Sequence, residues 1–138
     1  MKRRDPAPSV HAEVGFAAAP GGRGVAYARL RRAAGEYLLR VGFRLNAGFS
    51  DREVGYAAVT EIARALQRRG VRNAALAVGD AALLSELACT SDVPDTIVLP
   101  YVRLKCALNG FERVELLPNL SPELTQRARA EVALDTAA

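Results

Sequence analysis

This sequence of 138 residues is poor in the side chains that build disulfide frameworks and histidine-based sites. It contains two cysteines and one histidine. A chain of this length buries about two thirds of its extended surface on folding, so it needs no disulfide scaffold. No apolar run approaches the ~20 residues of a membrane span. The basic start of the chain is not followed by the apolar core of a signal peptide. We therefore expect one cytoplasmic domain that does not enter a membrane.

The few cysteine and histidine residues have ordinary structural interpretations. Cys89 and Cys106 fall in or at the end of predicted helices, and we interpret them as reduced core thiols rather than as a disulfide. His11 has no apparent partner in the sequence. It therefore fits an ordinary strand residue better than a catalytic base.

Basic residues outnumber acidic ones only modestly. Nineteen Lys and Arg residues oppose fifteen Asp and Glu residues, which gives a formal charge of +4. The bases are spread along the chain in small groups. This charge permits contact with a phosphate backbone but does not demand it. A solvated surface rich in arginine explains the same composition.

The clearest pattern in the chain is a long helix followed by a short buried strand. Ser50 and Glu53 have the spacing of a helix start, because each side chain can satisfy a free backbone N–H group of the other residue. Apolar residues at helical spacing continue the helix until Gly70, which ends it. An apolar strand over residues 74–78 follows and runs into Asp80. An acid at the carboxyl end of a strand is a common place for chemistry.

Alternating and helical patterns predict nine elements in the order βββαβααβα. The predicted strands are residues 9–16, 24–30, 36–45, 74–78 and 111–117, and the predicted helices are residues 50–69, 81–88, 100–108 and 121–134. Short turns join the first three strands, which predicts an antiparallel meander. The expected fold class is therefore α/β, a mixed five-stranded sheet with helices on both faces.

Four short segments resemble those of one known family. A Pro-Gly loop leads into a glycine-containing strand over residues 20–27, and the central helix contains Gly-Tyr-Ala-Ala-Val at residues 55–59. The fourth strand ends in Asp-Ala-Ala-Leu-Leu at residues 80–84, and Asn119 opens the last helical segment. In their order and in their local sequence, these segments resemble those of the type 1 ribonuclease H (RNase H) domain and its reverse-transcriptase-like bacterial relatives. The resemblance covers the chain from about residue 9 to residue 133.

The chemistry that this resemblance implies needs four carboxylates that converge on two Mg²⁺ or Mn²⁺ ions. The ions activate the attacking water and stabilise the leaving oxygen of a phosphodiester. Asp80 stands at the family's second aspartate position, and Glu123 replaces the last one. Counting back from the Pro-Gly loop places Glu13 at the first aspartate position. Other alignments of the loop place His11 or Gly15 there.

One expected ligand has no counterpart in this chain. Gly55 stands where the family has the glutamate of the central helix. Glu53 does not replace it simply, because two residues on a helix are about 200° apart around the axis. The resemblance thus implies a degenerate site with weak or lost hydrolysis. If the protein is active, Asp80, Glu13 and Glu123 are the expected catalytic and metal-binding residues.

Each of these acids also has a structural interpretation. Asp80 can cap the following helix by accepting its free N–H groups. Glu123 lies near the start of the last helix, where a negative charge suits the helix dipole. Glu13 can be an ordinary strand residue whose side chain faces the solvent.

The strand over residues 36–45 separates aromatic from basic side chains. Tyr37 and Phe43 share one face and, together with Tyr27 of the preceding strand, are expected in the core rather than on a base-stacking platform. Arg40 and Arg44 occupy the opposite face, where they could contact a phosphate backbone or simply be solvated.

Three functions follow from these expectations. The first is an RNase H-like domain that binds nucleic acid, an RNA–DNA hybrid or duplex, with metal-dependent hydrolysis weak or lost. The second is an active Mg²⁺- or Mn²⁺-dependent ribonuclease H that cuts the RNA strand of hybrids. The third is a protein-interaction or dimerisation module that keeps only the fold. The sequence is compatible with a homo-oligomer. We expect the domain over residues 9–134, after a disordered lead-in at residues 1–8 and before a short tail at residues 135–138.

Overall fold

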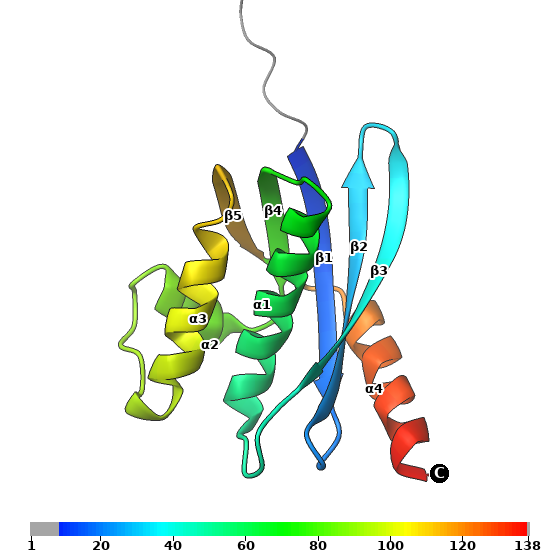
Figure 1. The fold of residues 1–138 in the computed structure, drawn as a ribbon, viewed down its shortest axis with the longest axis vertical. Coiled ribbons are helices and arrows are strands. Elements are labelled where there is room, and N and C mark those ends of the chain that lie inside the picture. Colours follow the sequence, from blue (N-terminus) through cyan, green and yellow to red (C-terminus); the bar gives the residue numbers. More distant parts are fainter. Residues whose placement is uncertain (1–8, 138) are drawn as a thin grey trace, which may run out of the picture.

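The computed structural model describes residues 9–137 and contains the nine predicted elements in the predicted order. Figure 1 shows their arrangement. The strands are β1 Ser9–Ala18, β2 Arg23–Arg32, β3 Gly35–Arg44, β4 Asn73–Val78 and β5 Arg113–Pro118. The helices are α1 Asp51–Arg68, α2 Ala81–Leu87, α3 Val98–Leu108 and α4 Glu123–Ala137, with a 3-10 turn at Asp95–Ile97 before α3.

The five strands form one mixed sheet with the order β3-β2-β1-β4-β5. β1, β2 and β3 pair antiparallel as a meander. β4 then pairs parallel with β1, and β5 pairs parallel with β4. The predicted fold class is therefore confirmed, including the three antiparallel strands at the start of the chain.

Alternation along the strands separates two cores on the two faces of the sheet. In β1, the side chains of Val10, Ala12 and Val14 join the larger core, which includes α1 and α3. Figure 1 shows α1 and α3 side by side across this face. The smaller core lies between α4 and the other face, with Tyr27 of β2 among its members. Helices thus cover both faces of the sheet, as predicted.

The central helix is formed by the signals that predicted it. The backbone N–H of Ser50 donates to Oε2 of Glu53 at 2.7 Å. Its apolar stripe lies in the larger core, where Ile62 and Leu66 are completely buried. Gly70 follows the helix with φ of +81°, the left-handed conformation expected of a terminating glycine.

Two expectations about side-chain burial are wrong. Cys89 and Cys106 are both exposed free thiols, and Cys89 lies in the turn after α2 with φ of +60° rather than in a helix. Tyr37 is 54% exposed, because it stands near the far end of the β2–β3 hairpin. In contrast, Tyr27 is buried and Phe43 packs in part against the larger core, as expected.

The proposed lead-in at residues 1–8 lies outside the described residues. At the other end, α4 continues to Ala137, past the expected boundary at residue 134. No helix in the described part of the chain is both long enough and apolar enough to cross a membrane.

Candidate functional site

Asp80 lies directly after β4 and caps α2. Its Oδ1 accepts a hydrogen bond from the backbone N–H of Leu83 at 3.0 Å. The structural interpretation of this residue is therefore confirmed. One of the two carboxylate oxygens is engaged by the cap, and the other faces the neighbouring helix.

The second oxygen of Asp80 points at Gly55 on α1. A Cβ atom added to Gly55 would lie 2.6 Å from Oδ2 of Asp80 and 3.3 Å from Cζ of Phe16 on β1. Asp80, Gly55 and Phe16 thus meet where β1, β4 and α1 converge. Sequence reasoning missed Phe16, although strand alternation places it on the same face of β1 as Val14.

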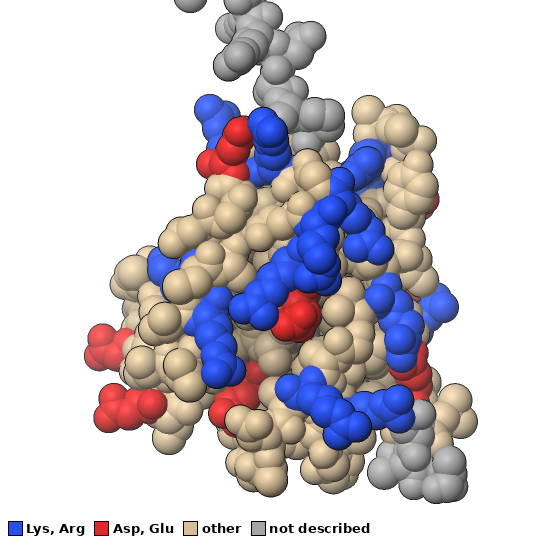
Figure 2. All heavy atoms as spheres, viewed as in Figure 1, with Lys and Arg blue, Asp and Glu red and all other residues tan. Residues whose placement is uncertain are grey.

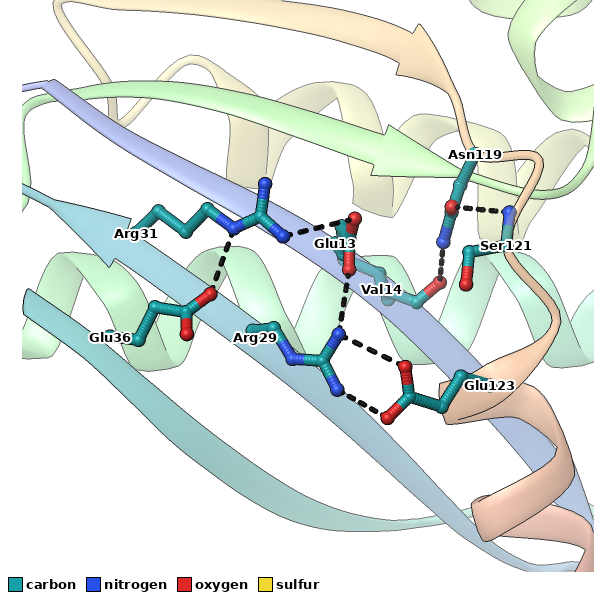
Figure 3. A network of polar contacts seen from close by, with 8 residues as sticks. All are labelled: Glu13, Val14, Arg29, Arg31, Glu36, Asn119, Ser121 and Glu123. Atoms are coloured by element: carbon teal, nitrogen blue, oxygen red, sulfur yellow. Dashed lines mark hydrogen bonds and ion pairs between the residues drawn. The ribbon is translucent and has the colours of Figure 1, made fainter.

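Glu13 lies on the opposite face of the sheet, in a network with α4 (Figure 3). Arg29 of β2 is paired directly across from it, and their side chains approach to 3.4 Å. The same guanidinium makes two hydrogen bonds to Glu123, at 2.6 and 3.1 Å. These bonds and the positive charge of Arg29 lower the pKa of Glu123 below its ordinary value. Arg31 lies 3.9 Å from Glu13 and completes the network.

Asn119 fixes the segment that leads into α4. Its Nδ2 donates to the backbone oxygen of Val14 at 3.4 Å, and its Oδ1 accepts from the backbone N–H of Ser121 at 3.0 Å (Figure 3). These bonds tie the start of α4 to β1. They place Glu123 on the same face as Glu13 and away from the Gly55 side of the sheet.

The structure therefore does not bring Glu13, Asp80 and Glu123 together. Within residues 9–134, whose side chains the structure describes, no group of three or more His, Cys, Asp or Glu side chains could hold a metal ion. Mg²⁺ and Mn²⁺ require several oxygen ligands. The neighbours of Asp80 at this point are a phenyl ring and a glycine. The residues present do not fit the two-metal centre that the resemblance implied.

A buried polar network that the sequence did not reveal lies next to Asp80. Glu86 of α2 is only 3% exposed and accepts a hydrogen bond from the hydroxyl of the buried Tyr56 at 2.5 Å. It also forms an ion pair with Arg52, which lies one helical turn before Tyr56. Glu86 raises the pKa of Arg52, and the charge of Asp80 adds to this effect. Burial, followed by the bond to Glu86, raises the pKa of Tyr56. The positive charge of Arg52 thus offsets the charge of Glu86 through a direct ion pair and, to a smaller extent, that of Asp80.

The two arginines expected to contact nucleic acid differ in their surroundings. Arg40 forms an ion pair with Glu131 of α4, which also accepts a hydrogen bond from the Tyr27 hydroxyl. These partners lower the pKa of Glu131 to about 2. Arg44 is exposed, and it makes no ion pair or hydrogen bond with its side chain among the described residues. Arg40 thus anchors α4, whereas Arg44 is free to bind a ligand.

Arg44 lines a groove of about 490 Å³ between the end of β3, α1 and α3. Arg64 of α1 and Arg103 of α3 line the same groove. On the face that carries α1 and α3, Figure 2 shows Lys and Arg side chains gathered in a diagonal band. The face that carries α1 and α3 is therefore a basic surface of the molecule in that view.

Solved structures with a similar fold include several RNase H domains, whereas the sequence matches no known family description and no curated protein. RNase H1 from the halophilic archaeon Halobacterium salinarum superimposes with a TM-score of 0.75 at 18% identity, over 92% of this chain and 98% of that one. The N-terminal RNase H domain of a Mycobacterium tuberculosis protein, solved as a fusion with maltose binding protein, gives 0.71 at 15% identity, over 96% and 100%. LC11-RNase H1 in complex with an RNA/DNA hybrid gives 0.71 at 11% identity, over 93% and 98%. The chain therefore has the RNase H-like fold over almost its whole length.

Proposed function

We propose that this RNase H-like domain binds nucleic acid, an RNA–DNA hybrid or another duplex, and does not cut it. The observation that carries the proposal is the surroundings of Asp80 on α1: Gly55, with the ring of Phe16 beside it, stands where the resemblance implied a glutamate. The likeness to LC11-RNase H1, whose structure holds an RNA/DNA hybrid, supports a nucleic-acid ligand. The formal charge of +4 is compatible with a polyanion.

Loss of hydrolysis follows from the chemistry of the reaction. Two-metal cleavage of a phosphodiester needs several oxygen ligands around one point. Asp80 offers one oxygen there, because the other accepts the cap bond from Leu83. Glu13 and Glu123 lie beside Arg29, which compensates their charge.

Cleavage and binding are tested together with a labelled RNA–DNA hybrid in Mg²⁺ or Mn²⁺. The matched control is Asp80→Asn, because asparagine keeps the side-chain oxygen that caps α2. We expect both proteins to bind the hybrid and to leave it intact, with the same affinity in the presence of EDTA. Affinity should fall steeply with salt, as for any partner held by its phosphates.

Three results would contradict the proposal in different ways. Cleavage by the wild-type protein that disappears in Asp80→Asn would establish an active, metal-dependent ribonuclease. Binding that requires Mg²⁺ or Mn²⁺ would show that a metal site forms with the substrate. Failure to bind any hybrid or duplex would favour the interaction module that keeps only the fold.

A further inference from the structure

β3 lies at one end of the strand order, so its outer edge pairs with no other strand in the described part of the chain. The strand is ten residues long and pairs with β2 through all ten positions without a bulge. Proteins usually keep an edge strand from pairing with another chain by short length, proline, lysine or a bulge. β3 contains neither proline nor lysine, whereas the other edge strand, β5, is six residues long and ends in Pro118. The outer edge of β3 is therefore accessible to a further strand.

The half of β3 nearest the turn to β2 carries exposed apolar side chains. Tyr37 is 54% exposed and Leu38 is 46% exposed, on opposite faces of the sheet. Figure 1 shows this end of the β2–β3 hairpin extending beyond the helices. Glu36 is the only charged residue from Gly35 to Leu39. An exposed, apolar edge strand with few charges is the kind of segment that pairs with another chain.

The order of side chains along β3 makes this edge complementary to a second copy of itself. Two copies related by a two-fold axis perpendicular to the sheet pair antiparallel, and each residue lies opposite the residue equally far beyond the axis. With the axis at Leu38, Glu36 of each copy lies opposite Arg40 of the other, and the two Leu38 side chains meet. On the other face, Tyr37 lies opposite Leu39. Opposite charges and apolar pairs directly across two strands stabilise a sheet.

Neighbouring registers of the same two strands lack this complementarity. With the axis at Tyr37 or at Leu39, a charged side chain lies opposite Leu38. With the axis at Glu36 or at Arg40, two identical charges face each other, and like charges directly opposite are destabilising. The register centred on Leu38 is therefore the favoured one.

The two charged side chains keep exposed surface for a partner, although each has an ion pair within its own chain. Glu36 lies 2.9 Å from Arg31, and its side chain is 60% exposed. Arg40 pairs with Glu131, and its side chain is 54% exposed. These ion pairs already restrict both side chains, so a second copy has less side-chain freedom to remove when it binds.

We propose that β3 is a dimerisation edge, at which two copies of this chain pair antiparallel about Leu38 and join their five-stranded sheets into one. This inference goes beyond the proposed function and does not depend on nucleic-acid binding. The contact consists of one strand edge and the side chains beside it. Such a small interface gives a weak dimer that forms as the protein concentration rises.

The test is sedimentation velocity over a range of protein concentrations, without nucleic acid. Leu38 lies opposite its own copy, so Leu38→Lys and Leu38→Glu each place two like charges at the axis. We expect either variant alone to weaken the dimer by roughly tenfold or more. An equimolar mixture of the two variants places a lysine opposite a glutamate, and we expect it to form a heterodimer.

The matched control is Leu99→Lys with Leu99→Glu. Leu99 is 59% exposed on α3, away from the edge of β3 (Figure 1). These substitutions make the same changes of charge and apolar surface, so we expect them to leave dimerisation unchanged. Circular dichroism checks the fold of the Leu38 variants, which should be intact because Leu38 belongs to neither described core.

Three results would overturn the inference. A wild-type protein that stays monomeric up to about 1 mM would show that the edge gives no useful association free energy. A dimer that Leu38→Lys leaves intact, or that Leu99→Lys weakens equally, would use another surface. If the two Leu38 variants are monomeric both alone and in the mixture, the strands do not pair in the register centred on Leu38.

Discussion

Substitution of Gly55 by alanine tests the contact on which the proposed loss of catalysis depends. Glycine within a helix is about 1 kcal/mol less favourable than alanine, so Gly55→Ala at an unobstructed position would stabilise the protein by that amount. Here the new Cβ would lie 2.6 Å from Oδ2 of Asp80. The carboxylate must therefore move if alanine is introduced.

The cost of that movement follows from the other carboxylate oxygen of Asp80, Oδ1. It accepts the backbone N–H of Leu83 at 3.0 Å, and loss of such a cap costs about 1 kcal/mol. The cap and the new contact together offset the gain in helix propensity. We expect Gly55→Ala to leave stability unchanged or to lower it by up to about 1 kcal/mol. In an Asp80→Ala background the closest obstruction is gone and the contact with Cζ of Phe16 at 3.3 Å remains, so the same substitution should stabilise by up to about 1 kcal/mol.

Urea unfolding of the four proteins of this double-mutant cycle measures the difference. Ala57→Gly is the control, because it changes helix propensity on the same helix, and it should cost about 1 kcal/mol in both backgrounds. A coupling of roughly 1–2 kcal/mol between positions 55 and 80 is expected. If Gly55→Ala stabilises both backgrounds equally, Asp80 does not lie against α1, and the account of the site is wrong.

Two further predictions concern the polar groups that hold the helices on the sheet. The pKa of Glu131 is lowered to about 2 in the folded protein. Its ionised carboxylate therefore stabilises the fold fully above pH 4.5, and this stabilisation is lost as the pH falls toward 2. With solvent screening at the half-exposed Arg40 taken into account, we expect Glu131→Gln to cost about 1–2 kcal/mol at pH 7 and to flatten the stability profile between pH 5 and 2, measured by urea unfolding. Tyr56→Phe removes a buried donor to the carboxylate of Glu86, so it should lower the free energy of unfolding by roughly 1.5–3 kcal/mol, and a change below about 0.5 kcal/mol would show that this bond contributes little.

The sequence predicted the elements because local patterns determine them. Alternation in β3 and the helical stripe of α1 each indicate one kind of structure, and turn residues separate them. Tyr37 shows the limit of this approach. Alternation assigns it to a face of the sheet, but it does not say whether a helix covers that end of the strand. The residue is exposed because the covering elements lie elsewhere on the sheet.

The position of Glu13 could have been predicted better from the same pattern. Counting back from the Pro-Gly loop assumes a loop length, whereas the pleat of a strand fixes the face of every side chain. Val14 belongs to the larger core, so its neighbour Glu13 must face the other way and Phe16 must face α1. The pairing of Val14 with Val78 then sets Phe16 beside the residues that follow β4.

Tertiary contacts between distant polar residues could not be predicted in this way. Tyr56 and Glu86 are thirty positions apart and join two different helices. Glu86 would be assigned to a solvated face by its charge, yet it is almost completely buried. The groove depends in the same way on three elements whose relative positions are fixed only by the packed core.

Gly55, where a glutamate ligand was expected, packs against Phe16 and Asp80 as one unit. The ring of Phe16 occupies space beside Gly55 that a longer side chain on α1 would need. Gly55→Glu alone would place a carboxylate between this ring and Asp80, where burial and like charge both oppose ionisation. Phe16→Asp alone would remove packing against the larger core and place a second acid beside Asp80. Neither single substitution restores a metal site, because each new acid would lack the oxygen ligands that must share the ion.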